Sequence, residues 1–279
     1  MFARFTGAAL RGLLVAFVVA IPSLLLPGSA SGTPEIVTLM ALVAALLTLV
    51  EYNSSYPSIV EFRSAPPLNR LRYGAVLAMV LTLTLIAKHA VEPTNLTTLV
   101  FGLGQRVGDL TDFPYSPVRL VVLMLPADAA PWTVTAMRIA AGISYVIALI
   151  TVALFLFAVR VLGWPTAHGA FNVWTNLPLF DPTAGGDVVH RLQRDGQINV
   201  VLGVLLPFAI PAVIKAASEL IRPLPFDEAQ TMIWVISAWA FLPASMIMRG
   251  IAMLRIAALI AQKRRRAYAD ADAEAAQAA

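Results

Sequence analysis

Four side chains able to bind a metal fall in one polar segment, residues 163–197: His168, Asp181, Asp187 and His190. Imidazole nitrogens and carboxylate oxygens are ligands that zinc and related divalent metals take in proteins. Their spacing, however, matches no established ligand motif. Two interpretations stay open: a metal site, or a solvated loop in which Asp187 caps a short helix over residues 188–194.

A second candidate is a pair of prolines, Pro207 and Pro211, inside an apolar segment. Each proline removes one helical hydrogen bond and leaves the carbonyl four residues earlier without its donor. The freed carbonyls belong to Gly203 and Pro207. They are candidates for coordinating a cation or a ligand hydroxyl, and the alternative is a kink packed against neighbouring helices.

The third candidate is a set of basic residues near the C-terminus, namely Arg249, Arg255, Lys263, Arg264, Arg265 and Arg266. Long basic side chains at the end of a membrane helix reach toward the headgroups. Each contributes about 1 kcal/mol near an anionic surface. We therefore predict contacts with anionic lipids or with a partner, the alternative being that the cluster acts only as a topology signal during insertion.

Catalytic motifs are missing from the sequence. It contains no P-loop, no G-x-S-x-G and no H-E-x-x-H, and it has no cysteine, which excludes thiolate metal sites and cysteine nucleophiles. The sequence thus identifies no catalytic residue and predicts no cofactor. No motif links the chain to a known family.

The composition shows which elements must position these candidates. Of the 279 residues, 59% are hydrophobic and only 13% are charged, whereas soluble proteins carry about 25% charged residues. The apolar residues gather in six segments, at 13–26, 36–50, 73–87, 137–162, 198–216 and 231–261. This pattern predicts an all-α, polytopic transmembrane helix bundle over residues 1–262, followed by a basic and polar cytoplasmic tail over residues 263–279. In that tail we expect the last helix to continue as a basic helix through Arg266 and the residues from Ala267 on to be frayed.

The distribution of basic residues predicts the orientation of the bundle. Lys and Arg collect in the cytoplasmic loops of membrane proteins. Here they are concentrated at the N-terminus and in residues 63–72, 160–194 and 263–266. Both termini are therefore predicted inside. Because these residues sit in short loops beside apolar segments, nucleic acid is not a predicted partner. The Ala-, Arg- and Val-rich composition is compatible with a GC-rich bacterial source, and we therefore expect the bacterial inner membrane as the location.

Two features leave alternatives to this topology. Residues 97–104 and 118–125 are apolar but short, and we interpret them as interfacial or re-entrant parts of the outer loop. If one of them crossed the membrane, there would be seven spans. The first 30 residues also resemble a signal peptide with a cleavage site after Ala30.

Three function classes remain open. The leading prediction is a non-catalytic accessory, scaffold or assembly subunit of a larger membrane complex, with anionic lipids and a membrane protein or a second copy as partners. The alternatives are a small-solute permease with a broken helix at residues 207–211 and an intramembrane lipid or pigment enzyme.

Overall fold

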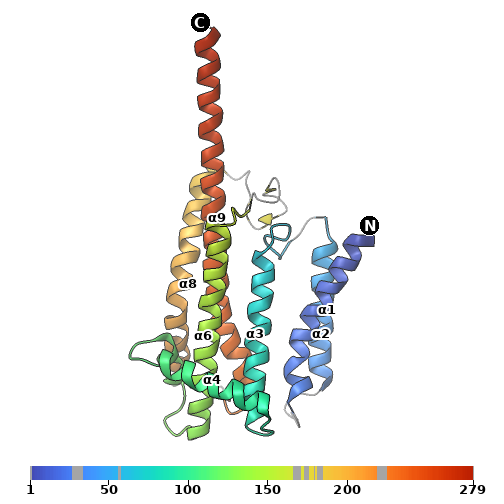
Figure 1. Ribbon diagram of the computed structural model, residues 1–279, viewed down its shortest axis with the longest axis vertical. Coiled ribbons are helices and arrows are strands. Elements are labelled where there is room, and N and C mark those ends of the chain that lie inside the picture. Colours follow the sequence, from blue (N-terminus) through green and yellow to red (C-terminus); the bar gives the residue numbers. More distant parts are fainter. Residues whose placement is uncertain are drawn as a thin grey trace.

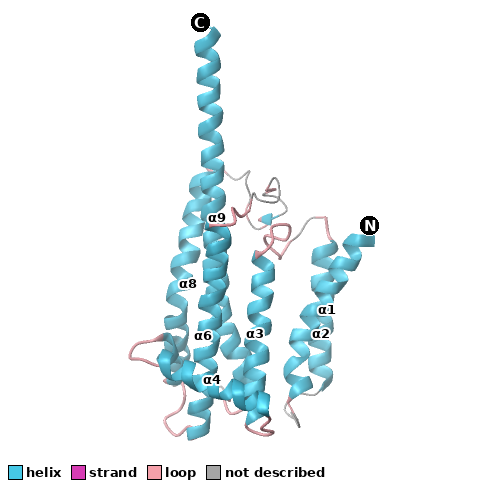
Figure 2. Ribbon diagram, viewed as in Figure 1, coloured by secondary structure: helices cyan, strands magenta, loops and turns pink. Residues whose placement is uncertain are grey.

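The computed structural model describes residues 2–26, 34–55, 58–165, 171, 172, 176–178, 180, 185–218 and 225–278. Within these residues all regular secondary structure is helical (Figure 2). Six helices are long and apolar enough to cross a membrane. They are α1 (Phe2–Leu25), α2 (Pro34–Asn53), α3 (Leu68–His89), α6 (Pro131–Arg160), α8 (Val188–Ser218) and α9 (Ala229–Ala278). The predicted all-α class and the six apolar spans are confirmed.

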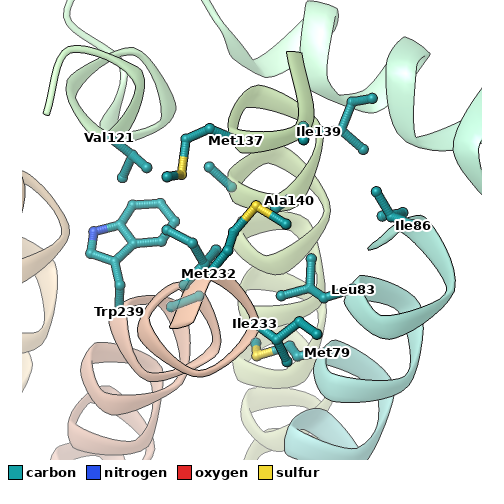
Figure 3. Close-up of a cluster of buried hydrophobic side chains, with 14 of the residues drawn as sticks. Met79, Leu83, Ile86, Val121, Met137, Ile139, Ala140, Met232, Ile233 and Trp239 are labelled. Carbon is teal, nitrogen blue, oxygen red and sulfur yellow. The ribbon is translucent and has the colours of Figure 1, made fainter. Parts of the chain in front are cut away.

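The core of the bundle lies where α3, α6 and α9 meet (Figure 3). Its side chains are almost fully buried and include Met79, Leu83, Met137, Ile233 and Trp239. The outer faces of the helices are also apolar, as at Leu39, which is 62% exposed. Helices that are apolar on both their inner and outer faces are stable only where hydrocarbon, and not water, surrounds the bundle. This pattern is therefore that of an integral membrane protein.

Two shorter helices follow α3. α4 (Asn95–Thr111) lies across the lower end of the bundle in Figure 1, and α5 (Pro117–Val122) follows it. Thr94 starts α4, because its hydroxyl accepts from the Thr97 amide at 3.3 Å while the Thr97 hydroxyl accepts from the Thr94 amide at 2.8 Å. α4 is longer than the eight apolar residues at 97–104 indicated, since the helix continues through its glycines to Thr111.

Helices α8 and α9 approach each other unusually closely. A Cβ atom added at Gly250 would lie 2.6 Å from the carbonyl oxygen of Gly196, and one added at Gly203 would lie 2.7 Å from that of Pro243. Small residues allow such contact between membrane helices. The glycines of α8 and α9 therefore determine how tightly this pair packs.

Both ends of the chain lie at the same end of the bundle (Figure 1). α9 has 50 residues, which corresponds to about 75 Å at the helical rise. Its last part projects beyond the other helices in Figure 1. The sequence predicted a frayed tail after Ala267, but the helix continues to Ala278 because the tail is rich in alanine, the strongest helix former.

Candidate functional site

A cavity of about 790 Å³ separates the α1–α2 hairpin from α3 and α9. Four arginines line it, Arg11, Arg63, Arg70 and Arg72, and we call it the arginine cavity. No Asp or Glu is among the described residues of its wall. The remaining wall residues are Gly7, Leu10, Leu14, Val15, Val18, Val19, Thr48, Tyr52, Val60, Phe62, Pro66, Asn69, Tyr73, Val76, Trp234 and Phe241.

Hydrogen bonds hold two of the arginines in the wall. Arg63 donates from Nη1 to the carbonyl oxygens of Glu51 at 2.6 Å and Ser54 at 2.8 Å. Arg72 donates from Nη2 to the carbonyl of Ser245 on α9, at 3.2 Å. Burial, together with the charge of nearby Arg4, lowers the pKa of Arg63. Arg63 therefore sits where positive charge is already concentrated.

The other two arginines make fewer contacts. The Arg11 guanidinium lies 4.8 Å from the centre of the Tyr52 ring, a cation–π contact. Arg70 is exposed at the start of α3 and has no hydrogen bond or ion pair with the described residues. Within the described residues, none of the four arginines forms an ion pair with a carboxylate.

Glu51 shapes the loop that carries Arg63. Its carboxylate is buried and accepts hydrogen bonds from the amides of Ser58 at 2.6 Å, Ile59 at 2.7 Å and Val60 at 2.9 Å. Three such bonds to one carboxylate fix the backbone of this turn. The sequence indicated only that the second apolar segment ends at residue 50, and the structure shows that Glu51 anchors the loop between α2 and α3.

A bidentate ion pair joins this loop to α9. Arg249 donates from Nε to Glu61 Oε2 at 2.6 Å and from Nη2 to Oε1 at 2.8 Å. The Glu61 side chain is 7% exposed and that of Arg249 is 24% exposed. Arg249, one of the basic residues that the sequence suggested for lipid or partner contact, thus has its counter-ion in a loop 188 residues away.

The loops at the end of the bundle that bears both termini pack against each other through backbone groups. Asn176 accepts from the amide of Phe62 at 2.7 Å and, through its side chain, from the amide of Ser64 at 3.0 Å. Trp164 donates to the carbonyl of Ala65, and Arg255 donates to the carbonyl of Trp164, each at 3.2 Å. Residues 58–67 are therefore held from both the α6–α8 connection and α9.

The predicted metal candidates are only partly described. His168 and Asp181 lie outside the described residues. Asp187 accepts from Arg264 at 2.5 Å and from the His190 amide at 3.4 Å, so it stands at the start of α8. The hydrogen bond from Arg264 lowers the pKa of the Asp187 carboxyl. No group of three metal-binding side chains occurs within the described ranges.

α8 also departs from the sequence-based expectation of a short helix and a separate span. It is one helix from Val188 to Ser218 and passes through both prolines. Trp239 of α9 donates from its indole nitrogen to the carbonyl of Pro207 at 3.1 Å. One of the two freed carbonyls therefore has a donor from a neighbouring helix, as a packed kink requires.

The basic residues near the C-terminus divide into two sets. Arg249, Arg255 and Arg264 have the intramolecular partners described above. Lys263, Arg265 and Arg266 are exposed on the projecting part of α9. The structure thus leaves these three available to an external partner.

The chain matches no protein-family model, and no curated protein and no solved structure is significantly similar to it. What the six apolar helices define is a multi-pass integral membrane protein.

Proposed function

We propose that this protein is a non-catalytic accessory or scaffold subunit of a larger complex in the bacterial inner membrane. The observation that carries this proposal is the projecting end of α9, residues 263–278. It is exposed along its described length, with a basic cluster at Lys263–Arg266 followed by acidic residues Asp270, Asp272 and Glu274.

The last part of α9 has no neighbouring helix in the described chain. Residues 263–278 extend for about 24 Å as the continuation of a membrane helix. The Arg264–Asp187 ion pair ties the base of this helix to α8. The rest packs on nothing in the described chain, so its basic and acidic side chains are free to dock against a partner.

A photo-crosslinking residue in place of Tyr268, which is 70% exposed, tests this function in native membranes. We expect one discrete product, reduced several-fold when Lys263–Arg266 are all replaced by Gln and reduced further at high salt. A product of twice the chain's mass would identify the partner as a second copy.

Two controls sharpen that experiment. Asp187→Asn removes the ion pair with Arg264 but keeps all four basic residues at 263–266, so it separates loss of that ion pair from loss of the basic charges. The same crosslinker at the outward-facing Leu149 of α6 should give no discrete product. The proposal is wrong if Tyr268 and Leu149 give the same pattern.

For the orientation, we propose that the end bearing both termini is cytoplasmic. Arg4, Arg11, Arg63, Arg70 and Arg72 belong to this end, as do the basic residues at 160–194 and 263–266. Fewer basic residues belong to the opposite end, where three are paired with carboxylates, namely Lys88 with Glu92, Arg119 with Asp112, and Arg138 with Asp109.

Reporter fusions check this orientation directly. A reporter joined to the C-terminus should be active in the cytoplasm, whereas one inserted near Asp112, after α4, should be active outside. Periplasmic activity of the C-terminal fusion would contradict the proposed orientation, and with it the docking of residues 263–278 to a cytoplasmic face.

The permease alternative rests on the segment at residues 207–211. The Trp239 indole already donates to the Pro207 carbonyl, and a Cβ at Gly203 would meet Ile247 Cγ1 at 2.6 Å. Both contacts support a packing role for this segment. The geometry therefore favours the accessory-subunit proposal.

A further inference from the structure

The arginine cavity has positive charge without a matching acid in its described wall. The Nε of Arg72 is buried and has no hydrogen-bond partner in the described chain. Arg70 is exposed, and its side chain forms no hydrogen bond or ion pair with the described residues. A buried cationic group is stable only when an opposite charge or an acceptor satisfies it. The wall is therefore complementary to an anion.

The two nearby carboxylates are already occupied. Glu61 lies close enough to influence Arg72, but both its oxygens accept from Arg249. Glu51 lies near Arg63, yet its Oε1 accepts from the amides of Ser58–Val60 and its Oε2 accepts from the Ser58 hydroxyl. An excess of positive charge thus remains at this end of the cavity, next to the first turn of α3.

The other end of the cavity is apolar. Along α1 the wall continues from Gly7 to Val19, about 18 Å at the helical rise. Phe241 and Trp234 of α9 and Val76 of α3 complete this part. The cavity therefore joins a cationic end near the membrane surface to an apolar end within the hydrocarbon region.

A cationic end joined to an apolar end distinguishes a phospholipid from a free phosphate, although both carry negative charge. Guanidinium groups bind phosphate oxygens through paired hydrogen bonds. A free phosphate would occupy only the cationic end, leaving the apolar wall against water. A phospholipid fits both ends, and the bilayer supplies it. We propose that the arginine cavity binds an anionic phospholipid, with the phosphate among Arg63, Arg70 and Arg72 and an acyl chain against Val76, Phe241 and Trp234.

This binding site is separate from the projecting helix and does not depend on a partner there. The test uses the full chain, delipidated in detergent, with three probes: phosphatidylglycerol, phosphatidylcholine and inorganic phosphate. Native mass spectrometry counts bound molecules. Quenching by phosphatidylglycerol with brominated acyl chains reports contact with Trp234, after subtraction of the signal of Trp234→Phe.

We expect one phosphatidylglycerol per chain, bound in preference to phosphatidylcholine, with quenching of Trp234. Arg70→Gln should weaken this binding about fivefold, since one basic residue near anionic lipid contributes about 1 kcal/mol. Arg63→Gln with Arg70→Gln should weaken it more than tenfold. The matched control is Arg160→Gln, which removes an exposed arginine at the same end of the bundle but outside the cavity.

Three results would overturn the proposal. One is equal binding of the two lipids. Another is an equal effect of Arg70→Gln and Arg160→Gln. The third is Arg70-dependent binding of inorganic phosphate without any quenching of Trp234, which would assign the cavity to a soluble anion. Arg70 has no partner in the described chain, so its replacement does not disturb folding, and circular dichroism verifies this.

Discussion

Glu61→Gln is expected to lower the free energy of unfolding by about 3 kcal/mol or more, because Arg249 would keep its charge in a largely buried position without a counter-ion. For a chain of this size, that corresponds to a fall of about 5–10 °C in Tm. Thermal unfolding in detergent, followed by circular dichroism, measures the change.

A matched control for this prediction is Glu92→Gln. Glu92 pairs with Lys88 at 3.5 Å but its side chain is 54% exposed, so its loss should change stability by less than about 1 kcal/mol. Adding Arg249→Met to Glu61→Gln should restore much of the loss, since the unpaired charge is then gone. Equal effects of Glu61→Gln and Glu92→Gln would show that burial does not strengthen the Glu61–Arg249 pair.

The second large effect is expected for Gly250→Ala in α9. The new methyl group would lie 2.6 Å from the Gly196 carbonyl oxygen and 3.0 Å from the Val200 amide nitrogen, and both are backbone atoms of α8. The helices must therefore separate. Overpacking of this kind costs about 1–3 kcal/mol, and we expect a value at the upper end because backbone cannot rotate away. The measurement is again Tm in detergent.

Gly74→Ala adds the same methyl group as Gly250→Ala, but we expect it to raise stability instead of lowering it. A Cβ at Gly74, in α3, meets nothing within 4 Å. Alanine should therefore stabilise α3 by about 0.5–1 kcal/mol through its helix propensity. If both substitutions raise Tm, the close approach of α8 and α9 is not a determinant of stability.

The six spans were predictable because each is a local property of the chain. A run such as 137–162 is too apolar for water and long enough for the bilayer, so neither fact depends on tertiary contacts. Helix ends were less predictable. α8 begins at Val188 rather than near Ile198, because its first polar turns pack beside α9, where Gly196 meets Gly250.

The arginine cavity was not predictable from the sequence, although its arginines were noted. Arg11, Arg63, Arg70 and Arg72 were interpreted only as topology charges, because that property can be counted without knowing which helices are neighbours. Their convergence depends on how α1 packs against α3. Likewise, Glu61 and Arg249 are 188 positions apart, and no periodic pattern connects them.

The projecting part of α9 carries a basic cluster at Lys263–Arg266 and acidic residues at Asp270, Asp272 and Glu274, and ionic strength determines how strongly these charges interact. Arg266 and Glu274 are eight residues apart, about 12 Å along the helix, whereas the Debye length at physiological ionic strength is about 8 Å. Counter-ions therefore largely screen Glu274 from Arg266, whereas Asp270 is only four residues, about 6 Å, from Arg266 and is not screened from it. Glu274 should therefore act as a negative charge separate from the basic cluster, so changing ionic strength should affect contacts at Lys263–Arg266 and at Glu274 separately.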